Sequence, residues 1–282
     1  MYSLKIRKLL IFLLIIGWGL TGAFFVFKKH NGQSPKRKTS IETEIKAIDT
    51  GSLLNQAMIL LQNRSDLKAE EMFEEILSYE PDNLDALWGK GEVLRRRRDF
   101  LKAGEIFKQI LKQNPNHGSA LTSLAYLEYN NDSFKEAIAL TEKALKIQNI
   151  SQQNKALAYL MLGAINSRLS QKGGFFSKIK YGTKIKGYFI RAYETDPSLS
   201  EVHVALGSFY LLAPAIAGGN LAKAIKELEL AVEICPNFAT ANARLAQAYL
   251  IKVDLLKYNF YLERAKELDP GNEVVKELEN NK

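Results

Sequence analysis

The stretch LDALWGKGEVLRRRRDFLKAGEIFKQILKQNP, residues 84–115, decides the fold of this chain. Its apolar residues recur at every third or fourth position in two segments, which is typical of helices that bury one face. The four arginines at 95–98 separate the two segments, and Pro115 ends the second because proline cannot continue a helix. The stretch therefore predicts a hairpin of two helices.

The same hairpin pattern recurs along the chain at a constant interval. Pro81 and Pro115 are separated by the same interval as Pro236 and Pro270, and an apolar periodic segment precedes each of them. Repetition at such a period, about 34 residues, indicates stacked helical units, because one hairpin cannot bury its apolar face alone. The units that we expect lie near 50–83, 84–117, 118–155, 156–199, 200–238 and 239–272.

These units resemble tetratricopeptide repeats (TPR), which have this length and keep residues of defined size at fixed positions. The unit at 84–117 has the small residues Gly91 and Ala103, the bulky Phe107, Ile110 and the final Pro115 at the matching positions. The resemblance implies an all-α fold, a right-handed superhelical solenoid of about six TPR hairpins over 50–272. First helices would line its concave face, and 273–282 would form a C-terminal capping helix.

The fourth and fifth units are longer than the period allows, and each excess contains a Gly-Gly pair. We expect the added residues in loops at 170–184 and 213–220, which would emerge on one edge of the stack. One account is neutral insertion, since surface loops tolerate it. Their apolar side chains favour a second account, in which they fold onto the concave surface or form a lip for a ligand or partner. The residues concerned are Phe175, Phe176, Tyr181, Pro214, Ile216, Gly218 and Gly219.

Residues 156–270, with both glycine-containing loops, are similar to the TPR component associated with TRAP transporters and to related bacterial TPR proteins. That resemblance implies an extracytoplasmic solenoid that binds a small ligand or a solute-binding protein. The chain has no cysteine directly after its N-terminal apolar run, so it departs from a lipoprotein pattern.

The N-terminus contains an uncharged apolar run at 9–27, which is close to the roughly 20 residues that a helix needs to cross a bilayer. A basic flank at 1–8 precedes it and a polar, basic linker at 28–49 follows it. We expect a retained single-pass transmembrane signal-anchor; a cleaved signal peptide is the alternative. More Lys and Arg residues follow the run than precede it, which favours a cytoplasmic solenoid, whereas the very short basic N-terminus favours an extracytoplasmic one; we expect the extracytoplasmic orientation.

No motif for catalysis, metal binding or nucleotide binding stands out. The three histidines and the single cysteine, Cys235, lack the spacing of a metal site, and no phosphate-binding glycine loop occurs. The net charge of +8 has no aromatic-interleaved basic face that would indicate nucleic-acid binding. The arginines at 95–98 fall in a turn, where charged residues are usually solvated. We therefore expect no enzyme, no cofactor, no metal and no nucleic-acid partner.

Two functions remain from the sequence. The first is a membrane-anchored scaffold or adaptor that binds another protein through the concave groove. The alternative is an extracytoplasmic accessory of a solute transport system that binds a small ligand or a solute-binding protein. The chaperone-type carboxylate clamp of TPR domains is not matched. The exposed residues that we expect on the concave face for a protein partner are Trp88, Glu92, Arg95, Tyr126 and Tyr129.

Overall fold

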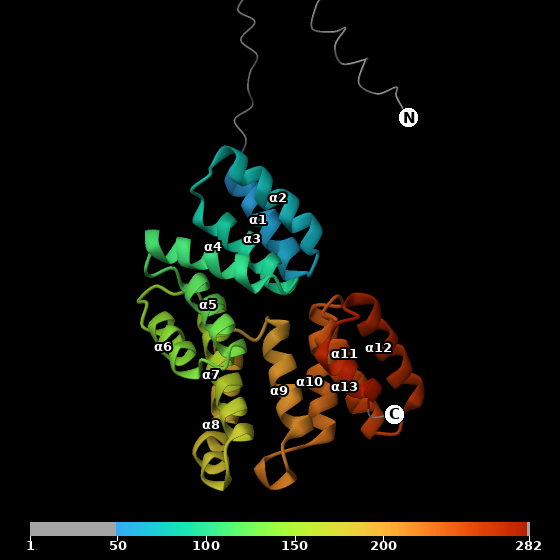
Figure 1. Ribbon diagram of the computed structural model, residues 1–282. Coiled ribbons are helices and arrows are strands. Elements are labelled where there is room, and N and C mark those ends of the chain that lie inside the picture. The colour runs from blue at the N-terminus through green and yellow to red at the C-terminus, as the bar shows by residue number, and fades with distance from the viewer. Residues whose placement is uncertain (1–48, 281–282) are drawn as a thin grey trace, which may run out of the picture. The chain divides into compact units, whose positions relative to one another are not determined.

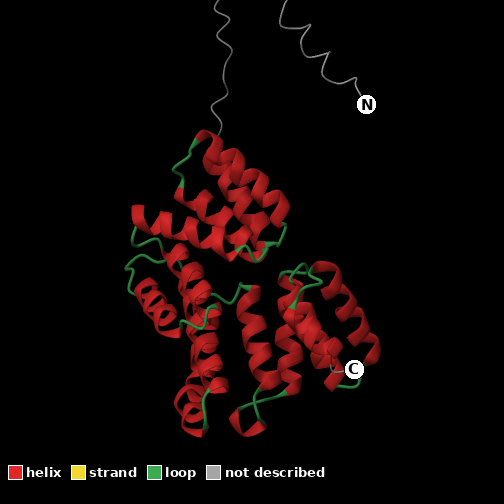
Figure 2. Cartoon of the chain, viewed as in Figure 1, coloured by secondary structure: helices red, strands yellow, loops and turns green. Residues whose placement is uncertain are grey.

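The computed structural model describes residues 49–280, which form helices, turns and no strand (Figures 1 and 2). Twelve helices pair into six consecutive hairpins, and a thirteenth follows them. Their bounds are α1 Thr50–Gln62, α2 Asp66–Tyr79, α3 Leu84–Arg96, α4 Phe100–Gln113, α5 Gly118–Asn130, α6 Phe134–Leu145, α7 Gln152–Lys172, α8 Phe175–Thr195, α9 Ser200–Leu212, α10 Leu221–Ile234, α11 Ala239–Ile251, α12 Leu255–Leu268 and α13 Glu273–Asn280. The prediction of an all-helical repeat solenoid is confirmed.

The predicted transmembrane run at 9–27 and the linker at 28–49, except for its last residue, lie outside the described residues. Among the helices of the described part, none combines the length and the apolar character that a bilayer span requires.

Four of the six hairpin turns have the same backbone geometry. The residue at the fifteenth position of its unit has a positive φ in each of them: Arg64, Arg98, Asp132 and Val253, with φ between 60° and 66°. This conformation reverses the chain shortly after the first helix. A β-branched residue such as Val253 rarely adopts this left-handed conformation. Because the Val253 side chain is exposed, the flanking helices rather than side-chain packing impose the conformation.

The fourth hairpin departs from this geometry in a way that the sequence did not predict. The expected loop at 170–184 is wrong, because α7 and α8 both have 21 residues and only Gly173 and Gly174 separate them. Phe175, Phe176 and Tyr181 therefore lie in α8 rather than in a loop. The added residues lengthen the hairpin, since each helix propagates through them without a breaker.

The fifth hairpin does contain the expected insertion. Pro214 follows the end of α9, a 3₁₀ turn η1 spans Ala215–Ala217, and Gly218 comes next with φ of 100°, which only glycine adopts without strain. The Asn220 amide donates to the Tyr210 carbonyl at 2.8 Å, so the loop closes on the end of α9.

Close crossing of helices inside and between hairpins organises the core. A Cβ at Gly163 would lie 2.2 Å from the Phe189 ring, and one at Gly89 would lie 2.2 Å from the Phe73 ring. Each ring therefore packs on a surface that only glycine leaves free. Phe73 is fully buried and belongs to a cluster that α1, α2 and α3 share, which shows how one hairpin covers the next.

The N-terminal and C-terminal hairpins touch, which a straight stack would not allow. Arg64 in the α1–α2 turn donates from Nη2 to Glu201 Oε1 of α9 at 2.6 Å, and its guanidinium lies 3.9 Å from the Phe238 ring centroid. Arg98 in the α3–α4 turn donates to the Gly271 carbonyl at 2.6 Å, ahead of α13. We call Arg64, Glu201, Phe238, Arg98 and Gly271 the closing contact.

Replacing Gly163 by alanine is expected to lower the free energy of unfolding by about 1–3 kcal/mol, because the new methyl displaces the Phe189 ring. The matched change Gly187→Ala, in the same hairpin, meets no atom within 4 Å and is expected to raise it by about 0.5–1 kcal/mol. Urea unfolding followed by circular dichroism measures both. Equal effects of the two changes would contradict this account of the crossing.

Candidate binding surface on the inner face

A polar network joins the first helices of the second and third hairpins. The Trp88 Nε1–H donates to Ser123 Oγ at 3.0 Å, and the Ser123 hydroxyl donates to Glu92 Oε1 at 2.6 Å. Arg95 holds both carboxylate oxygens of Glu92, with Nε to Oε1 at 3.0 Å and Nη2 to Oε2 at 2.7 Å. The bidentate pair fixes the position of the guanidinium on α3.

The carboxylate of Glu92 is buried, with only 6% of the residue exposed. Burial by itself would raise its pKa, but the charge and hydrogen bonds of Arg95, the charge of Arg96 and the Ser123 hydroxyl outweigh burial and lower the pKa from 4.5 to about 2. Glu92 is therefore ionised at neutral pH and has no free oxygen for a partner. The expectation that Glu92 is an exposed binding residue is wrong; it supports the surface from beneath.

The other expected residues are arranged around this network. Trp88 is half-buried and packs in the cores of the first and second hairpins. Arg95 is also half-buried, and its guanidinium carbon lies 4.4 Å from the ring centroid of Tyr126. Tyr126 and Tyr129 are partly exposed, one turn apart on α5, with ring centroids 6.4 Å apart. Arg95 and these two tyrosines form the tyrosine surface discussed below.

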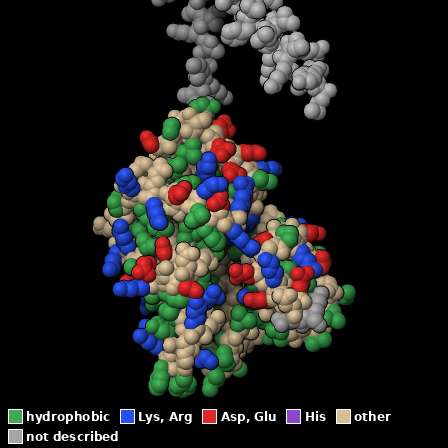
Figure 3. All heavy atoms as spheres, in the orientation of Figure 1, with side chains coloured by type: hydrophobic (Ala, Val, Ile, Leu, Met, Phe, Trp, Pro, Cys, Tyr) green, Lys and Arg blue, Asp and Glu red, His purple; other side chains and the backbone are tan. Residues whose placement is uncertain are grey.

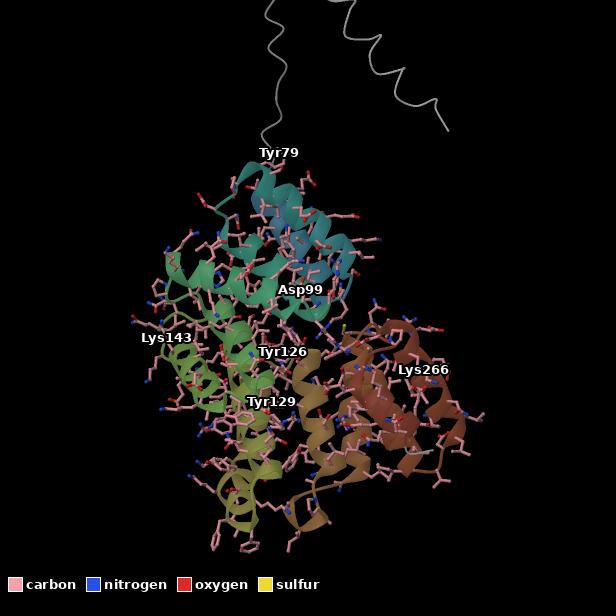
Figure 4. The ribbon with its side chains drawn as sticks, in the orientation of Figure 1. Tyr79, Asp99, Tyr126, Tyr129, Lys143 and Lys266 are labelled. Carbon is pink, nitrogen blue, oxygen red and sulfur yellow. The ribbon has the colours of Figure 1, made fainter. Side chains whose placement is uncertain are left out.

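The tyrosine surface faces the C-terminal half of the solenoid. Figure 4 labels Tyr126 and Tyr129 on the flank of α5 that is turned toward the C-terminal helices. The electrostatic environment supports this orientation, because the negative charge of Glu201 on α9 contributes to raising the pKa of Arg95. Burial raises the pKa of Tyr129, Arg168 opposes that shift, and Tyr126 and Glu273 of α13 add to it. The surface therefore combines two aromatic rings and a fixed cation with carboxylates on the opposite side.

The expected loop candidates do not join this surface. Phe175 and Phe176 at the start of α8 and Ile216 in η1 are exposed, and Tyr181 is half-buried. The expectation that they fold back onto the concave face is wrong for these three apolar side chains. Pro214, Gly218 and Gly219 shape the η1 loop, where Gly219 lies so close to Ala213 that a side chain would collide with its carbonyl.

Sequence reasoning missed the role of the arginines at 95–98. Besides the pair with Glu92, Arg96 donates to the Leu61 carbonyl at 2.7 Å and to Asp66 at 2.6 Å, and Arg97 pairs with Glu70. Burial, with repulsion from Arg64, lowers the pKa of Arg96 to about 10. These arginines hold neighbouring hairpins together rather than being merely solvated. The partners of Arg96 and Arg97 lie about one repeat earlier in the chain, so the repeat period was the available signal.

The histidines in the described part have structural partners. His203 is buried and its Nδ1 lies 2.8 Å from Glu227 while its Nε2 lies 2.8 Å from the Pro197 carbonyl. His117 caps α5 by accepting from the Ala120 amide at Nδ1. Within residues 49–280, no three His, Cys, Asp or Glu side chains gather in a way that would hold a metal ion.

Comparison with known proteins agrees with the fold. A family model described as tetratricopeptide repeat matches residues 54–116 and 98–152. The two matches together cover residues 54–152, which resemble the tetratricopeptide repeat family. No protein of curated function matches it.

Solved structures that are similar to the chain come from bacteria and from human. A thermophilic TPR protein of Thermus thermophilus, TTC0263, is 18% identical with a TM-score of 0.56, covering 70% of this chain and 97% of its own. Human IFIT1 dimer with PPP-AAAA is 18% identical with a TM-score of 0.55, covering 82% of this chain and 52% of its own. PilF of Pseudomonas aeruginosa is 15% identical with a TM-score of 0.46, covering 83% of this chain and 97% of its own.

Exchanging Glu92 for glutamine is expected to lower the free energy of unfolding at pH 7 by about 3 kcal/mol, because Arg95 keeps a buried charge without its counterion. The folded pKa of Glu92 is depressed, so its contribution is complete above pH 4.5 and disappears as the pH falls through about 2. The difference between the two proteins should therefore shrink as the pH falls below 4.5. Denaturant unfolding at a series of pH values measures it.

The exposed Glu105 on α4 supplies the control, since Glu105→Gln removes the same charge without opening a buried pair. A difference between Glu92→Gln and the unmodified chain that stays constant as the pH approaches about 2 would contradict the assigned role of the carboxylate.

Proposed function

We propose that this protein is a non-catalytic TPR scaffold that binds a segment of another protein on the tyrosine surface. The repeats themselves support interaction with a protein or peptide as the general role. The observation that carries the finer proposal is the pair Tyr126–Tyr129 beside Arg95, which is held in place by a buried carboxylate beneath. Rigid aromatic groups next to a fixed guanidinium are what protein interfaces use as binding centres.

The partner segment follows from the chemistry of this surface. The tyrosine rings can contact an apolar or aromatic side chain, and their hydroxyls, which donate no hydrogen bond within residues 49–280, can bind a polar group of the partner. Glu92 occupies the Nε–Nη2 edge of Arg95, and the guanidinium lies against the Tyr126 ring, so this cation is held in a position suited to stacking contacts. The partner segment that we propose is therefore apolar or aromatic at its centre.

The alternative, an accessory of a solute transport system with a ligand beneath the loops of the fourth and fifth hairpins, has less support. Such a site needs Phe175, Phe176 and Ile216 to close over an apolar pocket. These side chains are 71%, 84% and 100% exposed, respectively, and so enclose nothing. The scaffold is the better proposal.

We also propose that residues 9–27 anchor the scaffold in a membrane as a single-pass helix. The support is the sequence: an uncharged apolar run with basic residues on both sides. The solenoid would then be tethered by the linker at 28–49, with an extracytoplasmic position as the favoured orientation. The scaffold proposal does not depend on that orientation.

A photocrosslinking amino acid, p-benzoylphenylalanine, in place of Tyr129 is expected to give a discrete crosslinked product with one protein in native membranes. The same group in place of Leu101, which is 84% exposed on α4, should give none. Mass spectrometry of the product identifies the partner. Identical product patterns from positions 129 and 101 would contradict a binding site on the inner face.

Deletion of residues 1–28 is expected to release the protein from membranes washed with high salt while leaving its helical circular dichroism unchanged, because the described helices begin at Thr50. The full-length chain should remain in the washed membranes. Retention of the shortened chain would show that the anchor lies elsewhere, and loss of its helical signal would show that the apolar run belongs to the fold.

A further inference from the structure

The turns of the fourth and fifth hairpins expose large apolar side chains at one end of the solenoid. Phe175, Phe176 and Ile179 belong to the start of α8, Leu212 is the last residue of α9, and Ile216 lies in η1. All five are more than half exposed. Figure 3 shows hydrophobic side chains gathered at the lower end of this face, where Figure 1 places the α7–α8 turn and the α9–α10 connection. We call these five residues the apolar tip.

The length of the fourth hairpin explains the projection of the tip. Helix α7 has 21 residues and α5 has 13, so at 1.5 Å per residue α7 is about 12 Å longer. About half of this extra length lies at the end that carries Phe175 and Phe176, because nine residues of α7 follow Gly163 whereas five residues of α3 follow the corresponding Gly91. Helix α8 adds to it, since it begins 14 residues before Phe189 whereas α4 begins 7 residues before Phe107. Neither α5 nor α6 of the neighbouring third hairpin is long enough to cover these rings.

The two parts of the tip are neighbours in space. The Lys186 ammonium of α8 lies 6.0 Å from the ring centroid of Tyr210 on α9. A Cβ on Gly218, next to η1, would lie 3.5 Å from the same ammonium. The η1 loop therefore lies next to α8, and the apolar side chains of both hairpins lie at the same end of the described solenoid.

The segments that carry the tip contain basic residues and no acidic ones. Residues 143–193 contain no Asp or Glu, and neither do residues 202–226. Near the tip, Lys172 pairs with Asp132, whereas Lys178, Lys180 and Lys184 are exposed and form no ion pair within residues 49–280. We call these three the free lysines of the tip because no carboxylate pairs with them there; the Lys180 ammonium also lies 5.2 Å from the Tyr181 ring centroid. Figure 3 shows Lys and Arg side chains just above the hydrophobic group.

We propose that the apolar tip is a membrane-contact element that inserts into the interfacial region of an anionic bilayer. Exposed phenylalanine and isoleucine surrounded by lysines is the pattern of segments that lie in a membrane interface, where the apolar groups enter the acyl boundary and the cations meet lipid headgroups. An apolar protein partner would leave the three free lysines without counterions, whereas an anionic lipid surface supplies them. The tip contains no residue of the tyrosine surface, so this proposal is independent of the proposed scaffold function.

The test uses the full-length chain in phosphatidylcholine vesicles with or without about one third phosphatidylglycerol, a fraction that gives a strongly anionic surface. An environment-sensitive nitrobenzoxadiazole label is attached at Ile216→Cys in a Cys235→Ala background, so that the introduced thiol is the only one. With anionic vesicles the emission should shift to the blue and be quenched by lipids that carry a spin label on the acyl chain. A label at Leu101→Cys, an exposed apolar position away from the tip, is the matched control.

Two further variants separate the apolar and electrostatic parts. The double change Phe175→Ser and Phe176→Ser should abolish the shift of the label at 216, since these rings lie on the same end of the molecule. Lys178→Gln with Lys180→Gln and Lys184→Gln should remove the difference between anionic and zwitterionic vesicles. Raising the salt from about 0.1 M to about 1 M should act in the same direction, because the screening length falls from about 10 Å to about 3 Å.

Three results would overturn the proposal. In the first, the labels at 216 and 101 show the same emission and the same iodide accessibility in the presence of anionic vesicles, which would mean that position 216 does not enter the bilayer. A shift at 216 that survives both phenylalanine changes would place the contact elsewhere. A shift that occurs without lipid and grows with protein concentration would assign the tip to self-association.

Discussion

The close crossing of two helices at a glycine or alanine is the constraint on which the rest of the solenoid depends. Gly163 and Gly91 each lie against an aromatic ring of the second helix of the same hairpin, and a methyl group at either position would overlap that ring. The ring can then be buried completely, as Phe107 is. A hairpin of this shape still leaves its outer face apolar, so the next hairpin must cover it.

Stacking on this principle brings distant parts of the chain together. Arg64 of the first hairpin reaches Glu201 of the fifth, and Arg98 of the second reaches Gly271 beyond the sixth, each within hydrogen-bond distance. These contacts hold the C-terminal helices near the tyrosine surface, where Glu201 and Glu273 influence Arg95 and Tyr129. The polar network beneath Tyr126 gives that surface a fixed shape, because Glu92 and Arg95 satisfy each other in the interior.

The tyrosine surface and the apolar tip differ in chemistry and therefore suit different partners. The tyrosine surface is preorganised and mixed in character, as a protein-binding site is. The tip is apolar and basic with no acidic group in its hairpin turns, as a membrane-contact surface is. A scaffold that binds a partner on one surface and a bilayer on the other would hold that partner at a defined distance from the membrane. The proposed anchor at 9–27 would add a second point of attachment.

The sequence by itself determined the repeat period, the helical hairpins and the positions of the small and large core residues, because these depend on spacing within a single repeat. It also predicted that Tyr126 and Tyr129 are exposed on a first helix, and both are partly exposed, one turn apart on α5; their role in binding stays a prediction. Only the tertiary structure decided that Glu92 is buried, since its burial depends on Ser123 in the next hairpin and on the bidentate hold of Arg95. It likewise decided that the insertion in the fourth unit lengthens two helices and leaves Phe175 and Phe176 in solvent. Periodicity reports which face of a helix is apolar, but the length of the neighbouring helices determines whether that face is covered.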